Sequence, residues 1–502
     1  ELRDFKNIES DDIQEELQSL VKEMDLKKPN DKDYIMEVTD CIADIDTFFF
    51  THPTSRKNIG DYLAELNFAE IVLNLMRQIK DEEMKLESFW DQYFFAYISC
   101  YHYSLNSTKF AKRLIDNDIL QLLISNLTKK DFLENIESEQ SVFFILESSL
   151  QIISKLARST DLKSKFETIK ISEAIKHLIA INKEETLNFV AELTLIYIGQ
   201  MPDQPENFIK QLLSTLQMAL DDTNCRAEKG FYPWELIHCL SRLSSLNLIT
   251  EDLIQVDLLN NLKRMLLDNV NEEQRAAAEC LWHLGFDNSI LKKIQHEDDL
   301  NNALKSIANS EDSLVKENAQ GALWIIQEKY KNVPETYQTG ENSDVVFLSF
   351  HDDDKNPVET LCSELKSMGY TVIQDHKRID ESDFFDMCTQ LAHVSKVIVC
   401  LTDSFRDSPY CRTVAELALI NKKKTQVIKL KNSFNLDGWL ASKYNVQSTL
   451  EFADEASQEN CFKNLWKFLS KEQRGIKRHL SPGNLKFYVI LTEVNLFIKH
   501  NV

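Results

Sequence analysis

The stretch Ala276-Ala-Ala-Glu-Cys-Leu-Trp-His-Leu284 returns along the chain as Asn318-Ala-Gln-Gly-Ala-Leu-Trp-Ile-Ile326. Trp282 of the first stretch corresponds to Trp324 of the second, 42 residues later. Both stretches place apolar residues at the spacing of one helix face. A helical motif that recurs at a fixed period of this length indicates a repeat array rather than a single globular core.

A second, independent pair of motifs supports the same period. Asp257-Leu258 corresponds to Asp299-Leu300, again 42 residues later. Stepping back by one period from Trp282 reaches Leu240, which also lies in an amphipathic segment. Each such unit has an apolar face that it can bury only against its neighbours, so the units stack into a superhelical solenoid. Residues 1–330 resemble an armadillo/HEAT-type array, and the resemblance is clearest in the last two or three repeats.

Composition limits the class of protein. The chain has 502 residues with 10 Gly and 9 Pro, few for an all-β chain, which uses these residues in its turns. With 57 Lys+Arg and 80 Asp+Glu, the net charge is −23. Binding to nucleic acid or to anionic lipid depends on Lys and Arg, so neither is an expected partner. No apolar stretch approaches the roughly 20 residues of a membrane span.

The ten cysteines are scattered and form no CxxC pair. This pattern predicts reduced, buried thiols in a cytoplasmic protein and no metal site. We interpret His238 and His283, which lie in similar parts of neighbouring repeats, as packing residues rather than metal ligands. The chain begins with Glu1, and we expect it to be a processed chain or a fragment.

The pattern changes after the repeats. Residues 331–343 contain Pro and Gly among polar residues and are predicted to be a linker. Short apolar runs alternate with amphipathic helices over residues 344–472, which predicts βαβ units and a parallel sheet. Residues 473–502 form a tail for which the pattern supports no structural assignment. The predicted fold is therefore multidomain, an all-α solenoid followed by an α/β flavodoxin-like domain.

Five motifs in residues 344–472 resemble the TIR (Toll/interleukin receptor) family. Three match its first strands and two match the helix and the late motif that follow. They are Asp344-Val-Val-Phe-Leu-Ser-Phe350, Gly369-Tyr-Thr-Val-Ile-Gln-Asp375, Ser395-Lys-Val-Ile-Val-Cys-Leu401, Ser408-Pro-Tyr-Cys-Arg-Thr-Val-Ala-Glu-Leu-Ala418 and Asp437-Gly-Trp-Leu440. Each motif alone is weak, but together they are specific.

The resemblance implies two activities. One is self-association with other TIR domains, which scaffolds signalling in settings such as innate immunity. The other, in a subset of the family, is hydrolysis of NAD by a Glu four positions after an aromatic residue, where a carboxylate stabilises positive charge on the ribose. Here the aromatic is Tyr410, and Val414 occupies the position of the Glu. Glu416, the nearest carboxylate, is rotated by about 200° around a helix.

Four residues are candidates for ligand binding. Ser349 and Phe350 end the first strand, and Asp375 follows the second, at the edge where open parallel sheets bind ligands. Phe350 could stack on a base or pack in the core, and Asp375 could contact a ligand or serve as a loop or helix-capping residue. Arg412 could contact phosphate or pair with Glu416 at i, i+4.

The leading hypothesis is a signal-transduction scaffold or adaptor that needs no cofactor. It would act through TIR self-association and through a protein ligand on the solenoid. The alternative is an NAD glycohydrolase gated by the armadillo-like region, with Glu416 or another carboxylate as its acid. A third hypothesis is binding of NAD without cleavage.

Overall fold

The chain divides into two units, Glu1–Lys331 and Asn332–Val502. A computed structural model describes residues 13–25, 34–52, 55–81, 90–158, 166, 170–222, 227–249, 256–327, 342–374, 387–391, 393–432 and 434–470. The tail at 473–502 and most of the predicted linker lie outside these residues.

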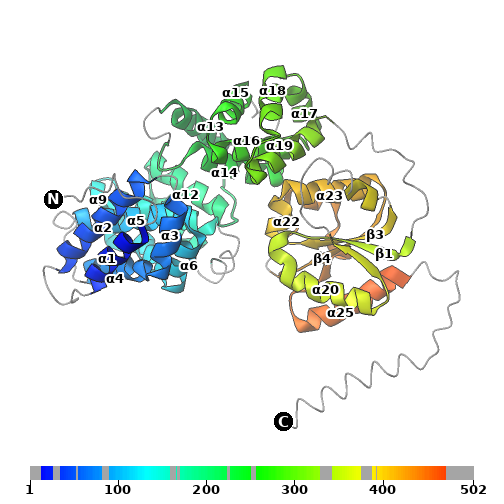
Figure 1. The fold of residues 1–502 in the computed structure, drawn as a ribbon, viewed down its shortest axis with the longest axis horizontal. Helices are drawn as coiled ribbons and strands as arrows, with labels where there is room; N and C mark the ends of the chain where they lie inside the picture. The colour runs from blue at the N-terminus through cyan, green and yellow to red at the C-terminus, as the bar shows by residue number, and fades with distance from the viewer. Residues whose placement is uncertain are drawn as a thin grey trace, which may run out of the picture. The chain divides into compact units, whose positions relative to one another are not determined.

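Helices stack in two layers in the N-terminal unit (Figure 1). In the first layer each helix contacts the next in chain order. Its members are α2 (Tyr34–Thr51), α5 (Trp90–Asn106), α9 (Gln140–Ala157), α12 (Glu185–Tyr197), α14 (Pro233–Ser245), α16 (Asn271–Leu284) and α19 (Ser313–Ile326). This arrangement is the predicted all-α solenoid.

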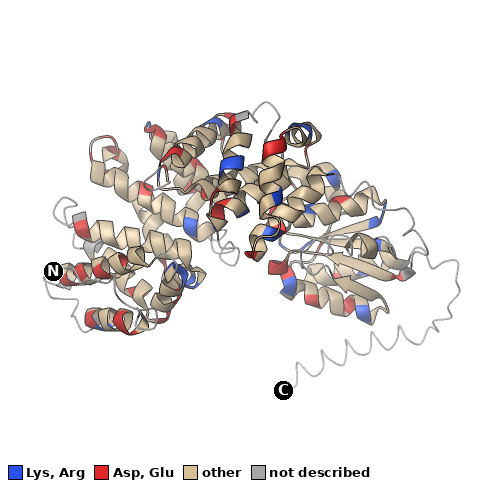
Figure 2. Cartoon of the chain, turned by 45° about the horizontal axis from the view of Figure 1, so that its top comes forward, with Lys and Arg blue, Asp and Glu red and all other residues tan. Residues whose placement is uncertain are grey.

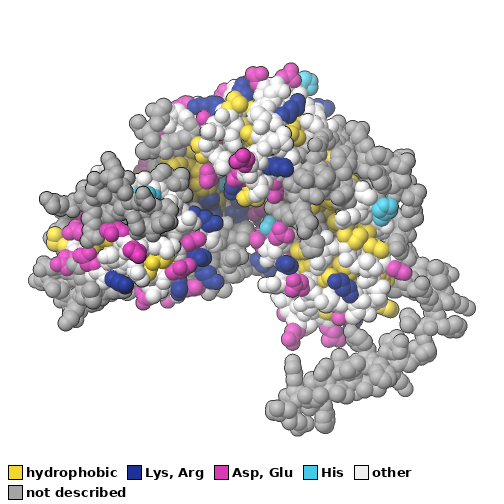
Figure 3. Space-filling model, in the orientation of Figure 1, with side chains coloured by type: hydrophobic (Ala, Val, Ile, Leu, Met, Phe, Trp, Pro, Cys, Tyr) yellow, Lys and Arg dark blue, Asp and Glu magenta, His cyan; other side chains and the backbone are white. Residues whose placement is uncertain are grey.

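The second layer packs against the first. It contains α4 (Phe68–Asp81), α7 (Ile119–Thr128), α11 (Ile171–Ile181), α13 (Pro205–Asp221), α15 (Val256–Leu267) and α18 (Asp298–Ile307). Shorter or terminal helices complete the unit: α1 (Ile13–Asp25), α3 (Arg56–Glu65), α6 (Thr108–Asp116), α8 (Lys130–Asn135) and α17 (Asn288–Gln295). Acidic and basic side chains both appear on the face of the molecule shown in Figure 3.

The 42-residue period is visible in the helices themselves. α16 begins at Asn271 and α19 at Ser313, 42 residues later. Trp282 of α16 is fully buried, and its ring lies directly over Gly321 of α19, where a Cβ atom would be 2.3 Å from the indole. The small residue therefore allows the two helices to approach closely. Leu240, one period upstream of Trp282, is buried in α14.

The C-terminal unit is built on a five-stranded parallel sheet of order β2-β1-β3-β4-β5. Its strands are β1 (Asn342–Ser349), β2 (Thr371–Gln374), β3 (Val394–Leu401), β4 (Lys424–Lys429) and β5 (Leu450–Glu451). β1 begins two residues before the predicted start at 344. All eight residues of β3 are buried, as expected for a central strand covered on both faces. The order is that of flavodoxin-like folds.

Helices cover both faces of the sheet (Figure 1). α20 (Lys355–Ser367) and α25 (Glu455–Ser470) share one face, where Leu361 and Leu465 pack with Leu348 and Ile398 in one core. α22 (Asp403–Asp407) and α23 (Pro409–Ile420) lie on the other face, and α24 (Gly438–Lys443) packs against α22. Charged residues of both signs are spread over the helices of both units (Figure 2).

The described cysteines, nine of the ten, are all buried, and none of these nine forms a disulfide. Within the described ranges, no helix has the length and apolarity that crossing a membrane would require. The same residues contain no cluster of three or more His, Cys, Asp or Glu side chains placed to hold a metal ion.

Candidate functional site

Helix α23 carries Val414, which the resemblance aligns with the Glu of the NAD-hydrolysing members of the family. Ser408 caps the helix, because its side chain accepts a hydrogen bond from the backbone N–H of Cys411 (3.3 Å), and Pro409 occupies the first turn. Val414 is fully buried. Its side chain therefore packs in the interior of the unit and leaves no room for a solvated carboxylate at this position.

Glu416 lies on the same helix and is held by two cations. Arg412 Nε donates to Glu416 Oε1 (3.1 Å), and Lys443 Nζ lies 3.5 Å from Glu416 Oε2. The guanidinium of Arg412 also lies over the ring of Trp439, 5.3 Å from its centroid. Arg412 therefore forms the i, i+4 ion pair with Glu416, which is one of the two roles predicted for it. Both carboxylate oxygens of Glu416 are therefore engaged by cations.

Two of the candidate ligand residues at the carboxyl edge of the sheet are buried. Ser349 is fully buried, and Phe350, only 4% exposed, packs in the core beneath α20 and α25. The thiol of Cys411 contacts the backbone oxygen of Phe350 (3.9 Å). The phenyl ring is thus a core residue and presents no face on which a base could stack. Asp375 lies outside the described residues.

A buried carboxyl lies at the same edge. Thr402 Oγ1, immediately after β3, donates to Asp354 Oδ2 (2.6 Å), in the turn before α20. Burial raises the pKa of Asp354, and the hydrogen bond from Thr402 opposes that rise. This hydrogen bond joins the segments that follow β1 and β3 and holds them together at this edge of the sheet.

A cluster around Arg406 was not anticipated from the sequence. Its guanidinium is 5% exposed and contacts Asp403 (3.1 Å), Asp407 (2.9 Å) and Asp437 (3.0 Å). Trp439 Nε1 donates to the backbone oxygen of Arg406 (2.9 Å). Asp437 and Trp439 of the late motif therefore both hold Arg406, which ties α24 to α22. The sequence signal for this cluster is that Asp403 and Asp407 lie on either side of Arg406.

The solenoid contains a second buried ion pair. Lys155 of α9 and Glu235 of α14 both have fully buried side chains and lie 2.5 Å apart. Arg158 adds a second cation 3.2 Å from Glu235, and Tyr197 of α12 donates to the Glu235 backbone oxygen (2.7 Å). Burial lowers the pKa of Lys155 to about 8, although Glu235 opposes the shift. Together with the hydrogen bond from Tyr197, the ion pair connects α9, α12 and α14 of the first layer, so we interpret its role as structural.

His238 and His283 lie where the predicted packing role places them. His238, half-buried on α14, has Nδ1 3.7 Å from Glu279 of α16, and His283 is buried on α16. Burial lowers the pKa of His238 to about 3, with nearby arginines adding to the effect. The imidazole is therefore neutral at physiological pH and does not form a charged pair with Glu279.

Comparison with known proteins identifies the C-terminal unit. The family model described as TIR domain matches residues 346–462. No curated protein was found to be similar. Solved structures similar to the chain include a designed armadillo repeat protein, YIII(Dq)4CqI, at 15% identity and a TM-score of 0.27, covering 62% of this chain and 99% of that chain. An engineered protein, target OR497, shows 16% identity, a TM-score of 0.32 and coverage of 62% and 78%.

Proposed function

Because residues 346–462 form a TIR domain, we propose that this protein is a signal-transduction scaffold or adaptor of the cytoplasm. It acts through self-association of the TIR domain and through a protein partner bound by the helical repeats. The observation that carries the proposal is the state of α23. Its family acid position is a fully buried Val414, and Glu416 is engaged by Arg412 and Lys443.

Chemistry at Glu416 would require these contacts to be broken. Hydrolysis of a glycosidic bond needs a carboxylate placed beside the ribose in a site that the substrate can enter. Glu416 instead completes a network that also includes the ring of Trp439 beneath Arg412. A carboxylate so held contributes to packing of α23 against α24, which is the role expected in a binding module.

The repeats supply a surface suited to a protein partner. The guanidinium of Arg158 lies 4.2 Å above the ring of Trp234, which stacks in turn with Tyr232. Arginine and aromatic side chains are enriched at protein interfaces and supply much of their binding energy. Trp234→Ala is therefore the variant with which to test partner binding by the solenoid.

NAD hydrolysis is the alternative function, and an assay separates it from the scaffold. The purified chain of residues 1–502 is incubated with NAD, and released nicotinamide is measured by chromatography. We expect no release above the buffer control. The matched variants are Glu416→Gln, which keeps the side-chain volume, and Glu359→Gln, which changes an exposed carboxylate on α20. Turnover that is lost in Glu416→Gln and kept in Glu359→Gln would overturn the proposal in favour of an NAD glycohydrolase.

Binding of NAD without cleavage gives a different result in the same samples. A ligand that binds only the folded protein raises its unfolding temperature. Stabilisation by NAD with no nicotinamide release would identify a nucleotide sensor. Self-association is measured by sedimentation velocity over a range of protein concentrations, and a chain that remains monomeric throughout would contradict the scaffold.

A further inference from the structure

A groove lies on the edge of the solenoid between two neighbouring connections. It has a volume of about 370 Å³ and is lined by residues around the end of α8 and the end of α11. Leu133, Ile136 and Ile181 supply aliphatic groups to this α8–α11 groove, and Glu134 and Glu137 supply carboxylates. Pockets that bind ligands have volumes of about 300–1,000 Å³, so the groove has the size of a small binding site.

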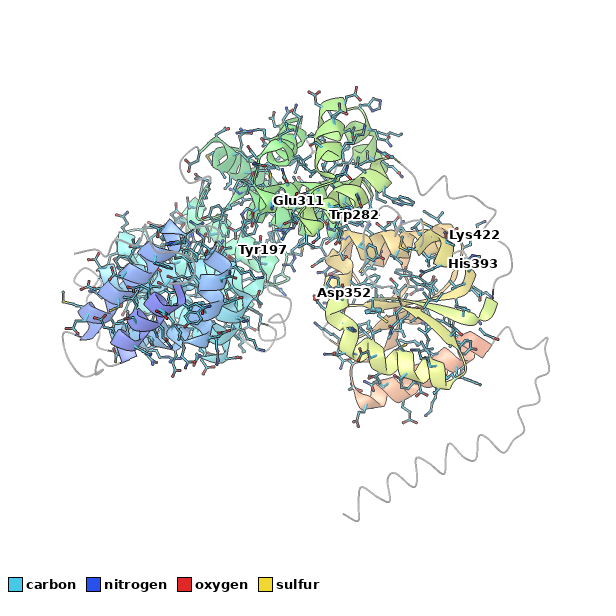
Figure 4. All side chains as sticks on the ribbon, in the orientation of Figure 1. Tyr197, Trp282, Glu311, Asp352, His393 and Lys422 are labelled. Carbon is cyan, nitrogen blue, oxygen red and sulfur yellow. The ribbon has the colours of Figure 1, made fainter. Side chains whose placement is uncertain are left out.

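The α8–α11 groove lies apart from the aromatic surface around Trp234. Ser138 and Asn182 line the groove, and they shortly precede the first residues of α9 and α12. Arg158, whose guanidinium lies over Trp234, and Tyr197, labelled in Figure 4, lie at the other ends of these two helices. Helices of 18 and 13 residues, rising about 1.5 Å per residue, place the two surfaces roughly 20 Å apart. A substitution at one surface therefore leaves the other unchanged.

The groove is acidic. Residues 131–139 carry no Lys or Arg, and their four carboxylates are Asp131, Glu134, Glu137 and Glu139. On the facing connection, Lys183 is followed by two more acidic residues. Lys130 lies 3.4 Å from Glu134, but the two side chains are 82% and 61% exposed, so the pair is weak and open to exchange. The dipole of α8 opposes a carboxylate in its last turn, so helix stability does not account for Glu134.

Lys and Arg side chains combine the two properties that such a groove recognises. Their alkyl stems pack along apolar surface while their charged heads stay in contact with water. In the groove, the buried Ile136 and the 43% exposed Ile181 offer the apolar surface, and Glu134 and Glu137 offer the partners for the charge. An exposed ion pair contributes at most about 1 kcal/mol, so a lone amine binds weakly. A chain segment that adds further basic and aliphatic contacts binds more tightly.

We propose that the α8–α11 groove binds a basic segment of a protein partner, with a Lys or Arg side chain of that segment entering the groove. Complementary charge steers the encounter and fixes its orientation. The inference rests on the proposed binding of a protein partner by the repeats. It adds a second contact surface to the one around Trp234 and specifies the chemistry of the partner that fits it.

A defined peptide tests the groove. The probe is a short fluorescein-labelled peptide of lysine and leucine, and the matched probe replaces each lysine with glutamate. Fluorescence anisotropy with the chain of residues 1–502 is expected to show binding of the basic peptide only. Glu134→Lys with Glu137→Lys is expected to weaken that binding by roughly tenfold or more, because attractive pairs become repulsive. Ile181→Ser is expected to weaken it by about threefold, because apolar contact is lost.

Matched controls separate the groove from a general effect of net charge. Glu272→Lys with Glu311→Lys makes the same charge change at exposed positions near α16 and α19, where Figure 4 labels Glu311. Leu267→Ser removes an aliphatic side chain that is 65% exposed on α15. Both controls are expected to bind the basic peptide as the unchanged protein does, and far-UV circular dichroism checks that all variants are folded. Equal binding by the groove variants and their controls would overturn the groove.

Photo-crosslinking locates the peptide on the unchanged protein and needs no variant. A benzophenone group in the basic peptide is expected to crosslink to residues 133–138 or 181–182, as mapped by mass spectrometry. Crosslinks confined to other segments, loss of binding in Trp234→Ala alone, or no binding of the basic peptide would each overturn the groove while the proposed scaffold stands. A chain that stays monomeric in sedimentation velocity contradicts the scaffold, whatever the peptide does.

Discussion

Replacing Gly321 with alanine tests whether the repeat array depends on the close approach of α16 and α19. A Cβ at this position would lie 2.3 Å from two ring carbons of Trp282 and 2.5 Å from a third. Carbon atoms in contact are about 3.5–4.0 Å apart, so the ring or the helix must move by roughly 1 Å. Because Trp282 is fully buried, such a movement disturbs its other neighbours as well.

Two opposing effects set the size of the change. Overpacking a buried site costs about 1–3 kcal/mol. Alanine stabilises a helix interior by about 0.5–1 kcal/mol relative to glycine. The overlap involves a rigid indole, so we place the cost at the upper end of its range. The net loss expected for Gly321→Ala is therefore about 2 kcal/mol of unfolding free energy.

Urea unfolding followed by far-UV circular dichroism measures this loss, because the helical array dominates that signal. The full chain has two units and need not unfold in one step, so the midpoint of the helical transition is compared. Trp282→Leu provides the control background, in which the added methyl has space. There, Gly321→Ala is expected to be neutral or stabilising. An increase in stability in the unchanged background, or an equal loss in both backgrounds, would refute the steric reasoning.

Three further predictions concern buried charges. Lys155→Met leaves the fully buried Glu235 without its closest cation, and it is expected to lower the unfolding free energy measured in urea by about 3–5 kcal/mol. The double change Lys155→Met/Glu235→Leu is expected to cost less, because no buried charge is then left without its partner. Burial raises the pKa of Asp46 of α2 from 3.8 to about 7, so the folded state binds a proton more tightly than the unfolded state between these values. Stability is expected to fall as pH rises from about 4 and to level off above about 7, and Asp46→Asn is expected to show a smaller fall between pH 5 and 7. Val414→Glu introduces a carboxylate at a fully buried position and is expected to lower the unfolding temperature of the TIR domain without producing nicotinamide release; release of nicotinamide would show that this position can open to substrate.

Much of the architecture could be predicted because it depends on local patterns. The recurrence of Trp282 as Trp324 located the repeats, since stacked units need the same apolar face in each copy. The alternation of short apolar runs and amphipathic helices predicted the parallel sheet for a similar reason. The start of the helix that carries Val414 followed from Ser408 and Pro409, whereas the match of position 414 to the family's Glu stays a prediction from the resemblance.

The candidate ligand residues were less predictable. Ser349 and Phe350 were correctly placed at the end of the first strand, yet whether Phe350 faced a ligand or the core depended on the helices covering the sheet. Arg412 offered two interpretations with the same sequence spacing. Only the positions of Trp439 and Lys443 in the folded unit distinguish an Arg412 that is ion-paired with Glu416 from one that is available to bind phosphate.

The amino-acid order by itself determined the helical repeat and the strands of the TIR domain, because each is encoded within one strand or one period. Tertiary structure decided which charges meet. Arg406 pairs with Asp437 across 31 residues, and Lys155 with Glu235 across 80. Such pairs form where packing brings distant segments together and excludes water, and no local pattern specifies that meeting.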